Sequence, residues 1–180
     1  MLPAPKSPYA ASKLAGEHLC RAFYESYGLE TIILRYFNVF GPYQNPYSQY
    51  AAVIPKFITA ALSGQPVVIF GDGQQSRDFT FVDNVVEANL AAIDAPKEAL
   101  GKVFNIACGE SFSLLELLEI LEGILRRKIK RLFREPQPGD VKHSRADISR
   151  AKKLLGYQPK IRFREGLQKT VEWFKDNLSK

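Results

Sequence analysis

Hydrophobic positions along the chain repeat with two different periods, and segments of the two kinds alternate. From Pro8 to about Tyr27 apolar side chains recur at helical spacing, and Gly28 ends the run. Residues 30–40 form a β-branched and aromatic run of strand length. Further strands are predicted at 66–70, 77–82, 102–108 and 128–133. Further helices are predicted at 51–64, 83–95, 113–127, 147–157 and 164–178. This alternation predicts the α/β class.

Turn and capping residues punctuate these segments. The Gly-, Pro- and Asn-rich stretch 41–49 and the stretch 135–144 are predicted loops. The Gly-Asp-Gly turn at 71–73 lies between two predicted strands, so we expect a hairpin there. Asp83 is the expected N-cap of the helix that follows it. Ser111 or Ser113 is expected to cap the helix near 113.

Composition and charge narrow the functional class. The chain has 180 residues, 46% of them hydrophobic, which is enough for a folded domain with a core. Its net charge of +6 is concentrated in the run Arg126–Arg134, which we interpret as a solvated face rather than a nucleic-acid site. Cys20 and Cys108 have neither metal-ligand nor disulfide-framework spacing. No signal peptide and no run long enough for a membrane span is evident, so a cytoplasmic location is expected.

A dinucleotide-binding domain normally begins with a strand and a glycine-rich turn that seats a pyrophosphate at a helix N-terminus. No G-x-G-x-x-G pattern occurs in these 180 residues. The phenol of Tyr9 and the ammonium of Lys13 are nevertheless one helical turn apart, at i and i+4. A fixed ammonium favours the phenolate form of a neighbouring tyrosine, which suits proton transfer. Alone, this pair is weak evidence of function, because the same spacing occurs by chance and more often reflects a packed aromatic residue and a solvated lysine.

Several segments in a fixed order make the pair more informative. The stretches SPYAASKLAGE, LRYFNVFGP, VIFGDGQQSRDFTFVDNVVEA and PGDVKHSRADISRAKKLLGYQPK resemble the extended short-chain dehydrogenase/reductase family of nucleotide-sugar epimerases and dehydratases. The resemblance implies the C-terminal part of a Rossmann-type fold, with its last parallel strands and a small substrate-binding lobe. It implies that residues 1–48 end the NAD-binding domain and that 49–180 form the sugar-nucleotide lobe, with 78–108 returning to the Rossmann sheet.

The resemblance also implies the chemistry at particular residues. Tyr9 would be the acid/base, and Lys13 would assist it and bind the nicotinamide ribose of NAD. Tyr36 would line the nicotinamide side. Transient oxidation at C4 of a UDP-sugar, followed by return of the hydride to the other face, would be the reaction.

Substrate contacts carry over in the same way. Asn38 and Arg77 match residues that bind the diphosphate, whereas Val53 and Phe70 match residues beside the nucleobase. Without the resemblance, Asn38 would be interpreted as a turn asparagine, Arg77 as a solvated arginine and Phe70 as a core strand residue. Ala52 stands where the family often has an asparagine.

Residues near position 140 bear on substrate choice. Asp140 matches the carboxylate that accepts a ribose hydroxyl, and Ser144 matches the position facing the C2 substituent of the hexose. A small residue at 144 leaves room for an acetamido group, so UDP-GlcNAc and UDP-GalNAc are expected substrates beside UDP-Glc and UDP-Gal. Gln137 replaces a common second diphosphate arginine, so either Arg134 substitutes for it or diphosphate affinity falls.

We therefore expect the chain to be the C-terminal half of such an enzyme, without its N-terminal Rossmann half. A homodimer through the Tyr9–Lys13 helix is expected when both halves are present. A 4,6-dehydratase, a UDP-glucuronate decarboxylase and a non-catalytic fragment remain alternatives.

Overall fold

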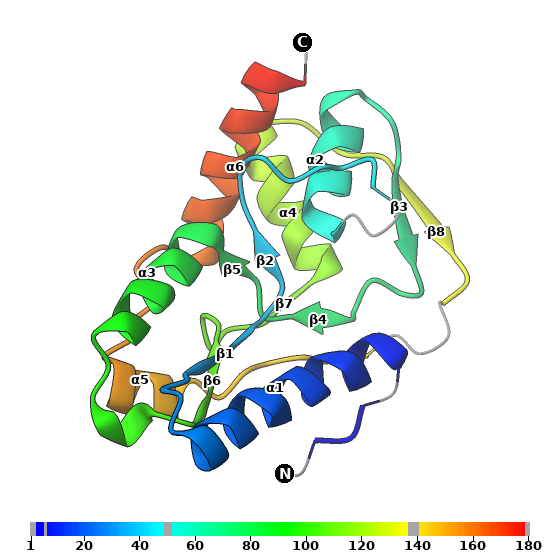
Figure 1. Ribbon diagram of the computed structural model, residues 1–180. Helices are drawn as coiled ribbons and strands as arrows, with labels where there is room; N and C mark the ends of the chain where they lie inside the picture. Colours follow the sequence, from blue (N-terminus) through cyan, green and yellow to red (C-terminus); the bar gives the residue numbers. More distant parts are fainter. Residues whose placement is uncertain (1–2, 6, 49–51, 137–140, 179–180) are drawn as a thin grey trace.

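The computed structural model describes residues 3–5, 7–48, 52–136 and 141–178, and Figure 1 shows how their elements lie. Its helices are α1 (Pro8–Tyr27), α2 (Val53–Leu62), α3 (Val82–Ile93), α4 (Leu114–Leu125), α5 (Ser149–Leu155) and α6 (Phe163–Asn177), with a 3-10 turn η1 (Lys97–Ala99). Its strands are β1 (Ile33–Tyr36), β2 (Val39–Phe40), β3 (Val67–Phe70), β4 (Ser76–Arg77), β5 (Thr80–Phe81), β6 (Val103–Ile106), β7 (Phe112–Ser113) and β8 (Arg131–Arg134). The α/β class is confirmed.

Strand pairing joins segments that are far apart in the sequence. The pairs β1–β6, β2–β5 and β3–β8 are parallel, and β4–β7 is antiparallel. The hairpin expected at Gly71–Gly73 is therefore wrong, because β3 and β4 lie in different sheets. The loop instead carries the chain from one sheet to the other. It is held by Gln75, whose side-chain amide donates to the carbonyl of Phe70 at 2.6 Å.

Two predicted strands are interrupted by polar residues. The run at 30–40 breaks between β1 and β2 because Asn38 has a φ of 35°, a left-handed value that asparagine tolerates better than most residues. The run at 77–82 breaks between β4 and β5 at Asp78. The Asp78 carboxylate accepts hydrogen bonds from backbone amides of other segments.

The two capping expectations have different outcomes. Helix α3 begins at Val82 with Phe81 as its N-cap, so Asp83 lies in the first turn and the expectation for it is wrong. Helix α4 begins after Ser113, whose hydroxyl accepts from the Glu116 amide. The Glu116 carboxylate accepts in return from the Ser113 amide, which completes a capping box.

The buried side chains form two cores. One core lies among α2, α4, α6 and the short strands, where the rings of Phe40 and Phe163 meet edge-on at 5.6 Å. The other surrounds the β1–β6 pair beneath α3 and α5 and contains Phe104, Ile106 and Tyr157. In Figure 1 the first core occupies the upper part of the molecule and the second the lower left.

Helix α1 lies across the front of the molecule in Figure 1. None of its described residues is buried. Its attachment includes the Glu17 carboxylate, which pairs with both Arg35 Nε and Arg35 Nη2. Gly28 ends the helix with a φ of 66°, a left-handed value that glycine adopts without strain.

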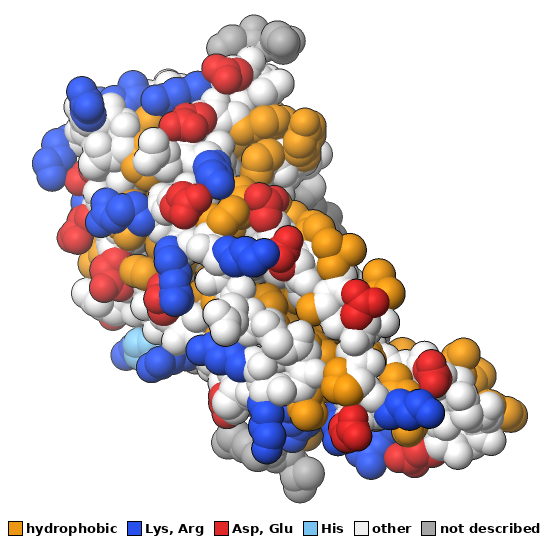
Figure 2. Space-filling view, turned by 90° about the vertical axis from the view of Figure 1, so that its left-hand side faces the viewer, with side chains coloured by type: hydrophobic (Ala, Val, Ile, Leu, Met, Phe, Trp, Pro, Cys, Tyr) orange, Lys and Arg blue, Asp and Glu red, His pale blue; other side chains and the backbone are white. Residues whose placement is uncertain are grey.

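The basic side chains of the run Arg126–Arg134 are exposed, as expected, whereas Ile129 within it is buried. Arg131 of β8 pairs with Glu122 of α4 at 3.4 Å. On the face shown in Figure 2, Lys and Arg side chains are interspersed with Asp and Glu rather than gathered into one positive patch. Among the described helices, none has both the length and the apolar character that a membrane crossing requires.

Candidate functional site

The main candidate site is a cavity of about 510 Å³ between α2, β3 and β4. Helix α2 supplies one wall through residues on a single face, and β3 supplies another through Val68 and Phe70. Its described lining residues are Asn38, Val39, Phe40, Ala52, Val53, Ile54, Lys56, Phe57, Ala60, Pro66, Val67, Val68, Phe70, Gln75, Arg77, Phe79 and Leu114.

Four predicted substrate residues meet at this cavity, although they lie up to 39 positions apart in the sequence. They are Asn38, Val53, Phe70 and Arg77. Their residue types are complementary: Arg77 and the Asn38 amide can donate hydrogen bonds, whereas Phe70 and Val53 offer an aromatic ring and a branched apolar side chain. The arrangement can therefore hold a ligand that is part anion and part flat ring.

Strand β3 exposes Phe70 because its side chains alternate. Val67 and Ile69 are fully buried, whereas Val68 and Phe70 are each 39% exposed. Backbone groups alternate in the same strand: the amides of Val67 and Gly71 donate to carbonyls of the β8 side. The Val68 carbonyl and the Phe70 amide therefore point to the other edge of β3.

Asn38 is fixed by backbone contacts with Asp78 and with Thr80, two residues further on. Its side-chain amide donates to the Asp78 carbonyl at 3.1 Å, and its own carbonyl accepts from the Thr80 amide at 3.2 Å. These bonds hold the left-handed turn and place the Asn38 side chain beside β4. Arg77, the last residue of β4, donates to the carbonyl of Ser76 at 2.9 Å.

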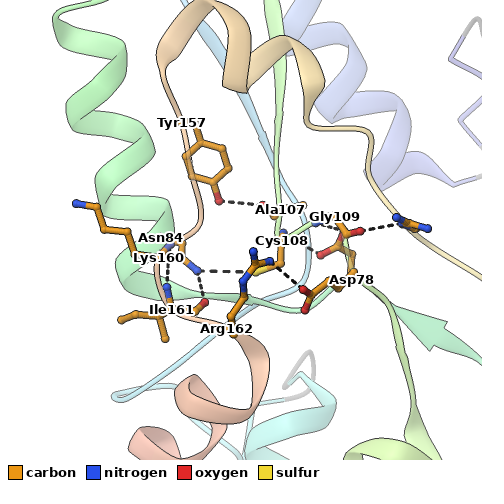
Figure 3. A network of polar contacts seen from close by, with 11 residues as sticks. Asp78, Asn84, Ala107, Cys108, Gly109, Tyr157, Lys160, Ile161 and Arg162 are labelled. Atoms are coloured by element: carbon orange, nitrogen blue, oxygen red, sulfur yellow. Dashed lines mark hydrogen bonds and ion pairs between the residues drawn. The ribbon is translucent and has the colours of Figure 1, made fainter.

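Asp78 is the central residue of a buried polar network that sequence analysis missed (Figure 3). Its side chain is fully buried and accepts from the amides of Cys108, Gly109 and Ala146 at 3.0–3.2 Å. Burial raises the pKa of Asp78, and the three amide donors oppose that rise. The network fixes the backbone immediately after Arg77, so Asp78 is a positioning residue for the cavity.

Asn84 and Tyr157 extend this network toward α6 (Figure 3). The Asn84 side-chain carbonyl accepts from the amides of Lys160 and Ile161, and its amide donates to the Ile161 carbonyl at 2.7 Å. The Tyr157 hydroxyl donates to the Ala107 carbonyl at 2.9 Å. Burial, more than the nearby Asp78 and Glu110 charges, raises the pKa of the Cys108 thiol to about 11. A carboxylate directly beside an apolar run, as Asp78 is in RDFTFV, is the sequence signal that points to such a network.

The predicted catalytic pair lies on the first two turns of α1. The Lys13 ammonium is 5.4 Å from the centroid of the Tyr9 ring, and the Tyr9 side chain is 72% exposed. The described cavity lining includes neither residue. The Tyr9 phenol is thus accessible to a ligand, and an ammonium lies close to it.

The other predicted site residues also lie outside the described cavity lining. Tyr36 donates from its hydroxyl to the Asn89 side chain on α3 at 3.0 Å. Ser144 is half-buried, and its amide donates to the Ser76 carbonyl at 3.0 Å, next to Arg77. Asp140 and Gln137 lie outside the described residues.

Known proteins of one family match the sequence of this chain. A family model described as the NAD dependent epimerase/dehydratase family matches residues 1–107. The UDP-glucuronate 4-epimerase of Thermodesulfobacterium geofontis is 39% identical over 97% of this chain and 52% of its own length. The chain thus spans about half the length of the curated relatives that it matches. At 33% identity the relatives also include a UDP-N-acetyl-alpha-D-glucosaminuronate decarboxylase of Bacillus cytotoxicus and a dTDP-glucose 4,6-dehydratase of Xanthomonas campestris.

Solved structures show the same fold. The UDP-glucose 4-epimerase of Thermotoga maritima, solved with UDP-glucose, matches with a TM-score of 0.93 and 40% identity over 98% of this chain and 56% of that one. The UDP-N-acetylglucosamine 4-epimerase of Methanobrevibacter ruminantium, in complex with UDP-N-acetylmuramic acid, matches with a TM-score of 0.90 and 45% identity over 96% of this chain and 55% of that one. The match of the family model to more than half of the sequence, together with these similarities, shows that the chain belongs to the NAD dependent epimerase/dehydratase family.

Proposed function

We propose that this chain is the substrate-binding and proton-transferring part of an NAD-dependent nucleotide-sugar 4-epimerase. The observation that carries the proposal is the convergence of Asn38, Val53, Phe70 and Arg77 on one cavity. A UDP-sugar has an aromatic base, a diphosphate and a hexose, and the cavity offers a group suited to the first two. Epimerases of UDP-sugars among the relatives and solved structures support this substrate class.

The base would lie against Phe70 at the free edge of β3. Uracil presents an N–H between two carbonyls. The Val68 carbonyl and the Phe70 amide provide one acceptor and one donor at that edge, as the β3–β8 pairing requires. The Arg77 guanidinium would bind the diphosphate, because its planar set of donors matches phosphate oxygens.

The exposed Tyr9 phenol and the neighbouring Lys13 ammonium fit the family's nicotinamide cofactor, since an ammonium is a hydrogen-bond donor suited to ribose hydroxyls. NAD, when bound, supplies the acceptor and donor of the hydride that leaves and returns to C4 of the sugar. Tyr9 would take the proton of the C4 hydroxyl as the C4–H bond breaks, and would return it to the oxygen at C4 after the sugar has turned. Lys13 would stabilise the phenolate form of Tyr9, which accepts the first proton and forms again when that proton is returned.

Binding of UDP-glucose and UDP-GlcNAc to the 180-residue chain, measured by calorimetry, tests the proposal. Arg77→Met should weaken both ligands about tenfold or more, because a charge-assisted phosphate contact is lost. Arg164→Met, which removes an exposed arginine from α6, is the matched control and should leave both affinities unchanged. Absence of binding to the unmodified chain, or equal effects of the two variants, would contradict the proposed site.

Catalytic assignment needs a second measurement. In a protein that joins this chain to the nucleotide-binding half of a relative, Tyr9→Phe should lower turnover at least about 100-fold, because proton transfer to a positioned side chain contributes on this scale. UDP-sugar affinity should change little, because the phenol oxygen acts on a proton in transfer. Product analysis in the same assay separates epimerisation from dehydration and decarboxylation.

A further inference from the structure

The described lining of the cavity contains two cationic side chains and no carboxylate. Lys56 and Arg77 are its charged side chains, and the remaining described lining residues are apolar or carry amides. Within the described ranges, no carboxylate lies closer than 4.0 Å to the Lys56 ammonium. Two cations that border one largely apolar cavity attract an anion, because the apolar walls screen their charge poorly.

Lys56 lies on the face of α2 that borders the cavity. Ala52, Lys56 and Ala60 stand at i, i+4 and i+8, and all three line the cavity. The two alanines flank the lysine with small side chains, which leaves the space around its stem open to a ligand. The N-cap residue Ala52 makes no side-chain hydrogen bond to the amides of the first turn. The N-terminus of α2 therefore keeps the positive partial charge of those amides.

We infer that Lys56 is the second cationic ligand of the diphosphate and shares it with Arg77. The inference rests on the proposed function and names a residue that sequence analysis did not identify. Glutamine at 137 leaves the second cation of the diphosphate site unassigned in the sequence, with Arg134 as the expected substitute. The nucleobase is neutral, whereas the diphosphate carries the negative charge of the ligand, so phosphate oxygens are the ligand atoms that attract the Lys56 ammonium most strongly.

A ligand series separates the phosphate contact from any other role of Lys56. Calorimetry with UDP, UMP and uridine is carried out on the 180-residue chain, on Lys56→Met and on Lys175→Met. Loss of a charge-assisted phosphate contact should weaken UDP binding to Lys56→Met about tenfold or more, and UMP binding less. Uridine affinity should stay within about twofold, and Lys56→Arg should restore most of the UDP affinity. Lys175 lies on α6, so Lys175→Met removes the same charge outside the cavity and should have no effect.

Three results would overturn the inference. Equal weakening of UDP and uridine by Lys56→Met would mean that Lys56 contacts the base. Unchanged UDP affinity would remove Lys56 from the site and leave the role of Arg77 intact. Failure of the unmodified chain to bind UDP would overturn this inference and the proposed function together.

The thermal midpoint of Lys56→Met should match that of the unmodified chain, because methionine is a good helix former at an exposed helical position.

Discussion

The residues that position the cavity are buried. The residues that we expect to contact the ligand either line the cavity or lie at the surface of the protein. Asp78 illustrates the first group: its carboxylate is fully buried, yet it faces away from the cavity toward backbone amides of two other segments. Arg77, the next residue back, lines the cavity. Adjacent residues of an extended strand point in opposite directions, so one anchors the strand while the other faces the ligand.

Asp78→Asn tests the anchoring role. Both carboxylate oxygens accept backbone amides, so an asparagine in either orientation would set its own NH₂ group against a backbone donor. We expect a loss of roughly 2–4 kcal/mol in the free energy of unfolding, measured by urea denaturation. Asp83→Asn is the control, since this exposed residue lies in the first turn of α3 and should cost under about 1 kcal/mol. A loss of similar size in both variants would contradict the role given to Asp78.

Ser144 tests substrate choice at the same scale. Its amide is tied to the Ser76 carbonyl, which places the side chain near the residue before Arg77. If the hexose C2 substituent faces this position, Ser144→Tyr should weaken UDP-GlcNAc binding at least about tenfold through overpacking, and should largely spare UDP-glucose. Competition of the two ligands on one sample measures the ratio directly. Equal changes for both ligands would show that residue 144 does not face the C2 substituent.

At the scale of elements, the end of α4 combines strain with an ionic cluster. Arg126 follows the helix with a φ of 52°, a left-handed value that is unfavourable for a residue with a Cβ atom. Arg126→Gly should therefore raise the free energy of unfolding by about 0.5–1 kcal/mol. The reciprocal control is Gly156→Ala at the end of α5, where φ is 64° and the space around the Cα is open. It should lower stability by about 1 kcal/mol through backbone strain alone, and a gain in stability there would contradict the reasoning.

Glu122 makes the same helix end dependent on pH. It accepts from the Ile129 amide at 3.0 Å and pairs with Lys128 and Arg131. The amide contact, together with these charges, lowers the pKa of Glu122 below its usual value. A carboxyl whose pKa is lower in the folded state stabilises the fold above its unfolded pKa of about 4.3, and this contribution is lost as pH falls through the folded pKa.

Glu122→Gln should consequently destabilise the chain by about 1 kcal/mol at pH 7, where the native residue is charged. The difference between variant and native chain should shrink as pH falls below about 4. Urea denaturation at a series of pH values measures both quantities. A difference that stays constant from pH 7 to pH 3 would exclude the ionised carboxylate as its cause.

At the scale of the whole molecule, two helices present apolar side chains to solvent. Leu19, Phe23 and Tyr27 lie at i, i+4 and i+8 on α1, with exposures of 47–79%. Helix α3 carries a similar stripe of exposed apolar residues at Val86, Leu90 and Ile93. Contiguous exposed apolar surface on this scale marks an interaction face.

We therefore predict that the 180-residue chain associates as its concentration rises. Sedimentation equilibrium should show a weight-average mass that increases above the monomer mass, and Phe23→Lys should reduce the increase because it places a charge within the α1 stripe. Val141→Lys, which replaces an exposed apolar residue outside both stripes, should leave association unchanged. A constant monomer mass at high concentration would argue against the α1 stripe as a contact face.

Much of the local structure follows from sequence pattern because it depends on neighbours in the chain. The start and end of α1, the capping box at Ser113 and the alternation of strands and helices depend on contacts within a few residues. The Tyr9–Lys13 pair is of the same kind, since helical periodicity alone brings positions i and i+4 together. The family resemblance, which the comparisons confirm, also rests on sequence alone.

Tertiary structure decided what depends on distant segments. The loop after β3 is no hairpin because β3 pairs with β8, some 60 residues later, and a glycine turn alone does not determine which strands pair. Asp78 binds amides at 108, 109 and 146, so its burial and anchoring role arise only when three distant segments meet. Lys56 resembles an ordinary helix-surface lysine until α2 packs beside β3 and β4 and turns that face toward the cavity. Local sequence determines local backbone geometry, whereas packing between elements decides which side chains share a site.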